Sequence, residues 1–173
     1  MLFRSPFSPL GVYGQTKAAG DALVSSLDRY YLLRTSWVIG DGNNFVRTMA
    51  GLADRGIEPA VVDDQYGRLT FTGELVRALQ HLLAVSAPYG TYNVTNSGPT
   101  RTWADIAGAV FEARGRADTA VRRVSTEEYG VGKAMAPRPQ HSVLALDKLT
   151  ATGFVPVDAD ELLKQYLDGL RSS

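Results

Sequence analysis

Two side chains near the start of the chain have the types and the spacing that proton transfer to a carbonyl requires. Tyr13 and Lys17 stand four residues apart in the segment Tyr-Gly-Gln-Thr-Lys, so on a helix they share one face and reach one ligand. An ammonium beside a phenol stabilises the phenolate and lowers the phenol pKa from about 10, which favours proton donation to a ketone oxygen near neutral pH. The bare pattern is equally typical of a surface tyrosine beside a solvated lysine.

The elements around this pair are the ones that must position it. Small and apolar residues recur at helical spacing over 15–27, which predicts a helix that packs closely against a sheet. Residues 31–39 form a nearly continuous apolar run with polar positions near its end, which predicts one buried parallel strand. Open α/β sheets bind ligands at the carboxyl ends of their strands, so this strand end is a candidate binding edge.

The rest of the chain continues the alternation of strands and helices. Thr102 is expected to cap a helix that Gly115 ends. Apolar patterning predicts further helices over 43–55, 73–86 and 160–170, short strands over 60–62, 91–94 and 121–124, and a loop over 130–142. This alternation indicates an α/β class with an incomplete Rossmann-like parallel sheet, because the strands are too few for a complete doubly wound sheet.

The composition is that of an ordinary globular protein. Of the 173 residues, 45% are hydrophobic, and 18 basic residues balance 18 acidic ones, so no global field favours nucleic acid or an anionic membrane surface. The absence of cysteine excludes thiolate metal sites and is compatible with a cytoplasmic location. Asp63 and Asp64 are adjacent, and strand geometry points them opposite ways, so no metal site is predicted. The opening residues lack the apolar run of a signal peptide or membrane span. The expected partners are small molecules.

Several longer motifs resemble those of the extended short-chain dehydrogenase/reductases, and most closely those of the dTDP-4-dehydrorhamnose reductases. The segment 8–21, Ser-Pro-Leu-Gly-Val-Tyr-Gly-Gln-Thr-Lys-Ala-Ala-Gly-Asp, is similar to the catalytic stretch of that family. Segments 33–40, 42–46, 62–67 and 92–98, and Arg138-Pro139 with Ser142, continue the similarity in the family's order. Motifs in register over essentially the whole chain are far less frequent by chance than one pentapeptide, so they favour the functional interpretation of Tyr13 and Lys17.

The resemblance implies an enzyme that reduces the 4-keto group of dTDP-6-deoxy-L-lyxo-4-hexulose to give dTDP-L-rhamnose, with NADPH preferred to NADH. Tyr13 would be the acid. Lys17 would hold the nicotinamide ribose hydroxyls and lower the Tyr13 pKa. Thr35 and Ser36 would lie beside the nicotinamide, where the predicted strand ends.

The resemblance also suggests residues for binding the dTDP-sugar. Trp37 would offer an apolar face to the deoxysugar ring, with core packing as the alternative. Asn43 and Asn44 would bond sugar or phosphate oxygens, or cap the following helix. Arg68 and Arg138 would bind the diphosphate, because guanidinium groups pair bidentately with phosphate, or they would be solvated surface residues.

The sequence departs from this family in its dinucleotide-binding segment. No Gly-x-x-Gly-x-x-Gly pattern occurs in it, and the family's catalytic Ser or Thr would lie further upstream of Tyr13 than the twelve residues that precede it. We therefore expect residues 1–58 to be the remnant of an NAD(P)-binding domain and 59–173 to be mainly the substrate-binding domain, with elements of the two interleaved. Such a truncated chain would be inactive by itself, and its uncovered sheet edge would favour a homo-oligomer.

Two alternatives to this reductase remain. A chain without its dinucleotide segment could be a non-catalytic binding or regulatory module of the same family. It could also be another extended short-chain sugar-nucleotide reductase or an epimerase, which would share the Tyr-x-x-x-Lys motif but would not usually carry Trp37 in this context.

Overall fold

Parallel strand pairs and covering helices make up an α/β fold, as the sequence predicts. The computed structural model describes residue 9 and residues 11–117 and 120–171. Three parallel pairs join β1 (Tyr31–Arg34) to β6 (Gly90–Asn93), β2 (Val38–Ile39) to β5 (Thr70–Phe71), and β3 (Ala60–Val62) to β8 (Arg122–Val124). A fourth pair, β4 (Tyr66–Gly67) with β7 (Arg101–Thr102), is antiparallel.

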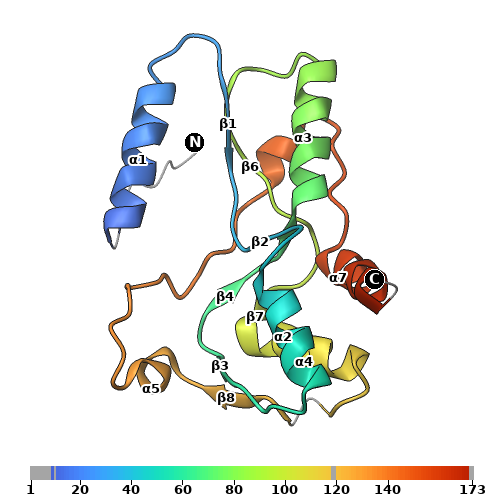
Figure 1. Ribbon diagram of the computed structural model, residues 1–173. Helices are drawn as coiled ribbons and strands as arrows, with labels where there is room; N and C mark the ends of the chain where they lie inside the picture. Colours follow the sequence, from blue (N-terminus) through green and yellow to red (C-terminus); the bar gives the residue numbers. More distant parts are fainter. Residues whose placement is uncertain (1–8, 10, 118–119, 172–173) are drawn as a thin grey trace.

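Seven helices in the described part of the chain accompany these strands (Figure 1). The predicted long helices are all present, with ends shifted by one to three residues. Thr102 caps its helix through a reciprocal capping box with Asp105, as its position before the apolar pattern suggests. The helices are α1 (Val12–Val24), α2 (Phe45–Asp54), α3 (Thr72–Ala84), α4 (Trp103–Ala113), α5 (Thr126–Gly130), α6 (Asp147–Thr150) and α7 (Ala159–Arg171).

The prediction of one strand over 31–39 is wrong. The chain leaves β1 after Arg34, turns at Trp37, and starts the separate strand β2, which pairs with a different partner. The turn follows from the backbone of Trp37, whose φ of 49° lies in the left-handed region. The run of apolar residues does not reveal such a turn, because apolar residues resume after the polar stretch 34–36 and make the whole segment look like one strand.

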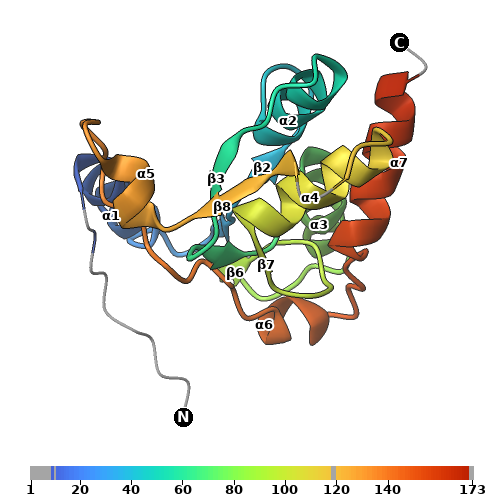
Figure 2. The ribbon, with the colours of Figure 1, turned by 90° about the horizontal axis from the view of Figure 1, so that it is seen from below.

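Two hydrophobic cores hold the described part of the molecule together. The first joins α2, α4 and α7 to β2, β3 and β5, and α4 and α7 lie side by side in Figure 2. The second lies between β1, β6, α3 and α6 and contains Leu82, Tyr92 and Leu149. The two cores do not occupy separate halves of the chain. Before residue 58, the expected domain boundary, α2 joins the first core and β1 joins the second. After that boundary, α4 joins the first core, whereas α3 and β6 join the second.

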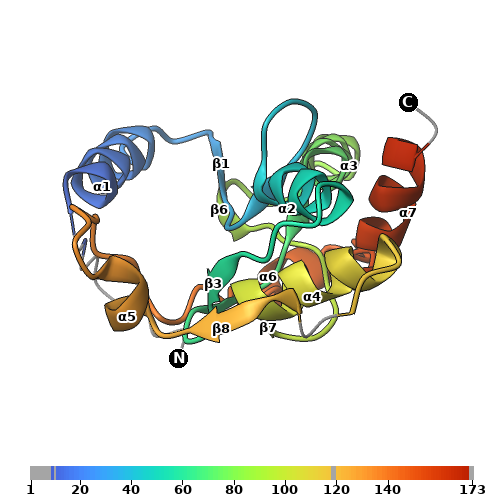
Figure 3. The ribbon, with the colours of Figure 1, turned by 60° about the horizontal axis from the view of Figure 1, so that its bottom comes forward.

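Helix α1 stands apart from both cores. It projects on the same side of the molecule as α5 (Figure 3), and none of its residues is buried. The apolar stripe that predicts this helix is therefore not part of either core, although Ala18 lines a cavity that α1 shares with the end of β1. Strand β1 pairs with β6 on one edge, and its other edge has no strand partner among the described residues. Association of two copies of the chain through that edge stays a prediction. No helix in the described part of the chain is long and apolar enough to cross a membrane.

Candidate functional site

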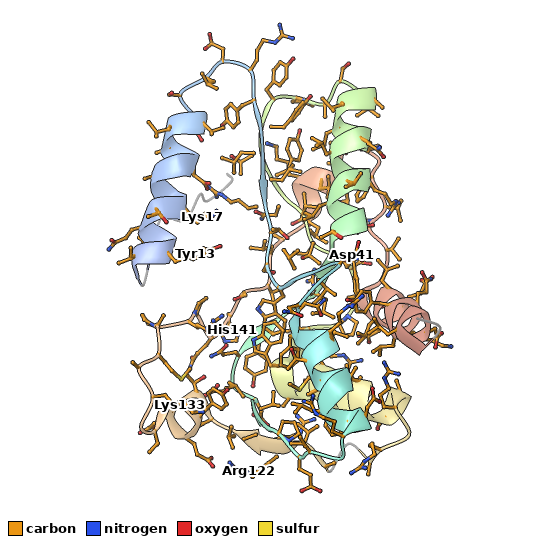
Figure 4. All side chains as sticks on the ribbon, in the orientation of Figure 1. Tyr13, Lys17, Asp41, Arg122, Lys133 and His141 are labelled. Carbon is orange, nitrogen blue, oxygen red and sulfur yellow. The ribbon has the colours of Figure 1, made fainter. Side chains whose placement is uncertain are left out.

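Tyr13 and Lys17 occupy the first turns of α1 and project from the same side of it, toward the rest of the molecule (Figure 4). The Lys17 ammonium nitrogen lies 5.6 Å from the centroid of the Tyr13 ring. Tyr13 is 76% exposed, so its hydroxyl is open to a ligand and to water. The spacing of the two residues thus puts both groups within reach of one bound molecule.

A cavity of about 570 Å³ lies between this side of α1 and the carboxyl end of β1. Tyr13, Lys17 and Thr35 all line it, and Leu144 contributes from a distant segment. An ion pair of 2.8 Å between Arg34 Nε and Asp21 Oδ2 connects the end of β1 to α1 across the cavity. Three of the residues predicted from the sequence therefore meet at one strand end, where α/β sheets bind ligands.

Ser36 and Trp37 follow directly, in the turn between β1 and β2. The Ser36 hydroxyl oxygen is buried and has no hydrogen-bond partner within the described part of the chain. Its own carbonyl accepts a hydrogen bond of 2.5 Å from the Thr70 hydroxyl. A buried hydroxyl without a partner costs free energy, so Ser36 is a candidate for a ligand contact.

The Trp37 indole packs against other residues of the protein. Its ring stacks on that of Trp103, with centroids 3.8 Å apart and planes inclined by 17°. Its backbone conformation costs on the order of 1–3 kcal/mol, and the half-buried side chain packs at the edge of the first core. Trp37 therefore lies next to the candidate site with part of its surface already occupied.

The two asparagines differ sharply in their surroundings. Asn44 caps α2, its side-chain oxygen accepting from the Arg47 backbone N–H at 3.0 Å. Its amide nitrogen donates to the Gly40 carbonyl and to the Tyr166 hydroxyl, both at 2.8 Å. Of the alternatives for this residue, helix capping is the one that its contacts satisfy. Asn43 is exposed.

The two arginines proposed for the diphosphate come from separate segments. Arg68 follows β4 and is half-buried, and its Nε has no partner in the described part of the chain. Arg138 is exposed in the loop after α5. That loop is held against β4, since the Tyr66 N–H donates to Gln140 at 2.7 Å and the Ser142 N–H donates to Tyr66 at 2.8 Å. The His141 ring stacks on Tyr66, a contact that the sequence does not signal.

A second Tyr-x-x-x-Lys pair exists, which sequence reasoning missed. Tyr129 and Lys133 have the same spacing, and the Lys133 ammonium lies 3.5 Å from the centroid of the Tyr129 ring. Tyr129 lies in the last turn of the short helix α5 and Lys133 follows that helix, and neither residue lines the cavity beside β1. The two motifs have the same spacing, but only Tyr13 and Lys17 line the cavity at the end of β1.

Several acidic residues make structural contacts. Asp64 accepts hydrogen bonds from the Thr126 hydroxyl at 2.5 Å and from its backbone N–H at 2.9 Å, and these bonds lower the pKa of the Asp64 carboxyl. A second cavity of about 520 Å³ between α4 and α7 has paired charges on its rim, including Arg101 with Asp160 at 2.5 Å. No group of three or more potential metal ligands occurs within the described residues.

Solved structures of sugar-nucleotide reductases share this fold. The chain is 36% identical to a dTDP-4-dehydrorhamnose reductase of Clostridium acetobutylicum ATCC 824, with a TM-score of 0.86 over 97% of this chain and 59% of that one. It is also 36% identical to the Bacillus anthracis str. Ames dTDP-4-dehydrorhamnose reductase in complex with NADP, with a TM-score of 0.82 over 95% and 57% of the two chains. The class expected from the sequence motifs is thereby confirmed.

The chain itself belongs to the RmlD substrate binding domain family, whose model matches residues 3–172. A curated relative, the spore coat polysaccharide biosynthesis protein SpsK of Bacillus subtilis (strain 168), is 40% identical over 164 residues, which cover 94% of this chain and 56% of that protein. The chain therefore spans little more than half the length of these relatives.

Proposed function

We propose that this chain is the sugar-binding and proton-donating part of an NADPH-dependent reductase that converts dTDP-6-deoxy-L-lyxo-4-hexulose to dTDP-L-rhamnose. One observation carries the proposal: Tyr13, Lys17 and Thr35 line a single cavity at the carboxyl end of a parallel strand. Membership of the RmlD substrate binding domain family supports the sugar-nucleotide part of the proposal.

The residues around the cavity fit the nicotinamide and ribose end of such a cofactor. Lys17 supplies an ammonium that can donate to ribose hydroxyls, and Thr35 supplies a hydroxyl at the strand end. Ser36 adds a buried hydroxyl that lacks a partner among the described residues. The 173 residues contain no glycine-rich segment that could bind the pyrophosphate. Lys17, Thr35 and Ser36 therefore account for binding only the nicotinamide end of the dinucleotide.

When bound, a nicotinamide cofactor would supply the hydride that reduces the ketone carbon. Tyr13 donates its phenolic proton to the ketone oxygen, so that the C=O becomes CH–OH and a phenolate remains on Tyr13. The Lys17 ammonium stabilises that phenolate by its charge. Because Tyr13 is largely exposed, water can return the proton to it after the product leaves.

The test is Tyr13→Phe, in a chain to which a dinucleotide-binding segment of the family is joined. Loss of a positioned proton donor lowers turnover roughly a hundredfold to ten-thousandfold, so NADPH oxidation with the dTDP-4-keto sugar should fall by that factor. NADPH affinity should stay nearly constant, because the substitution removes one hydroxyl and keeps the ring.

Tyr129→Phe is the matched control, because it makes the same change in the second Tyr-x-x-x-Lys pair. It should keep the parent turnover. If Tyr13→Phe keeps more than half of the parent turnover with chemistry rate-limiting, or if Tyr129→Phe reproduces the loss, the proposed role of Tyr13 is wrong.

A further inference from the structure

The backbone at Trp37 is held in an unusual conformation by its neighbours. Its φ of 49° is one that a bulky side chain rarely adopts. The Trp37 carbonyl accepts a 3.0 Å hydrogen bond from the backbone N–H of Thr70, which is completely buried in β5. Strain of this kind persists where the surrounding structure over-determines a residue, and it concentrates at binding sites.

The indole of Trp37 is confined by two residues. Trp103 stacks on the ring at a centroid distance of 3.8 Å. A Cβ atom at Gly67 would lie 2.5 Å from Trp37 Cε2 and 2.8 Å from Cδ2, far inside van der Waals contact. The close approach of Gly67 to the indole therefore depends on the absence of a side chain at Gly67, and the same ring is also in contact with Trp103.

One small structural unit brings these two residues together. In the β4–β7 pair Gly67 lies opposite Arg101, and Trp103 begins α4 directly after β7. The capping box of Thr102 and Asp105 fixes the first turn of that helix, and Phe45 packs on Trp103 with ring centroids 4.7 Å apart. Trp103 is thus itself rigidly placed, so it can orient a neighbouring ring.

We infer that Trp103 and Gly67 are positioning residues for Trp37, which hold its indole in one orientation before a deoxysugar nucleotide binds. This inference rests on the proposed function, since it takes the exposed part of Trp37 as the surface that meets the sugar. The stack occupies part of the indole, and the sugar meets the remainder. A ring that is already immobilised loses little conformational freedom on binding, which favours affinity.

The first experiment measures the stack without any ligand. Two indoles in close parallel contact couple their transitions and give a paired positive and negative band in circular dichroism. The parent chain should show this couplet, and Gly67→Ala should abolish it because the new methyl group displaces the Trp37 ring. Gly73→Ala is the matched control, since a Cβ there meets nothing within 4 Å, and it should keep the couplet.

The second experiment measures dTDP-rhamnose affinity by titration calorimetry of the 173-residue chain. Trp103→Leu should weaken binding roughly threefold to tenfold, from the loss of an aromatic pair. Trp103→Phe keeps a ring for Trp37 to stack on and should restore most of the affinity. A cooperative thermal unfolding transition shows that each variant is folded. Substitutions at Gly67 and at Trp103 test the inference independently.

The inference fails if the parent chain has no couplet, if Gly67→Ala keeps it, or if folded Trp103→Leu binds dTDP-rhamnose as tightly as the parent. In the last case the parent still binds the sugar nucleotide, and the proposed function stands. If the parent binds no dTDP-sugar, with or without NADPH, the proposed function itself fails and the positioning role fails with it.

Discussion

Asn44 should contribute strongly to stability, and Asn44→Ala measures that contribution. The substitution removes the N-cap of α2, worth about 1 kcal/mol. It also removes the two hydrogen bonds that the amide donates to Gly40 and Tyr166, worth about 1 kcal/mol each. Together these losses lower the free energy of unfolding by about 3 kcal/mol. With urea slopes of about 1–3 kcal/mol/M, the unfolding midpoint should fall by about 1 M or more.

The assay is urea unfolding followed by circular dichroism, with Asn43→Ala as the matched control. Asn43 precedes Asn44 and is exposed, so its replacement should change the free energy of unfolding by less than about 0.5 kcal/mol. Equal midpoints for Asn44→Ala and the parent would refute the reasoning, because they would mean that these hydrogen bonds contribute nothing net to folding.

Two further predictions use neighbouring residues in the same way. Leu82→Ala should cost about 2–5 kcal/mol of stability, because Leu82 is 0% exposed in the second core. Leu83→Ala should be nearly neutral, because Leu83 is 59% exposed. Thermal or urea unfolding compares the two variants, and similar costs for both would contradict the assignment of the buried face of this helix. The lowered pKa of Asp64 means that its hydrogen bonds with Thr126 add stability above the unfolded pKa of about 3.9, and that this stability is lost as pH falls through the folded value. The destabilisation caused by Asp64→Asn should therefore be largest near pH 7 and shrink as the pH falls below the unfolded pKa of about 3.9. Asp63→Asn is the control, and a pH-independent difference for Asp64→Asn would contradict the prediction.

The helices were predictable from the sequence because their signals are local. The helix around Leu82 and the Thr102 cap depend on residues within one or two turns, and the structure contains both. The apolar face itself was predicted less well, because Val76, Leu79 and Leu83 are exposed. The two-residue strands β4, β5 and β7 were missed because pairing between distant segments defines them. Such pairing leaves almost no periodicity in the sequence.

The candidate site divides along the same line. Tyr13 and Lys17 were predictable because four residues of a helix connect them. The contact between Trp37 and Trp103 joins residues 66 positions apart in the sequence, and the role of Gly67 depends on an approach that no pattern encodes. Asn44 looked like a candidate ligand because a polar side chain before a helix serves a cap or a ligand equally well until its partners are known.

The exposure of α1 has a thermodynamic consequence for the residues that it carries. Peptide helices of about 12–15 residues are only marginally stable in water, and α1 has 13 residues of which none is buried. The free energy that opens α1 locally is therefore smaller than the free energy that unfolds either core. Any molecule that binds the ordered form of this helix also raises its helical population by mass action. Ligand binding at Tyr13 and Lys17 is thus linked to the helix–coil equilibrium of α1, which places the two side chains on one face.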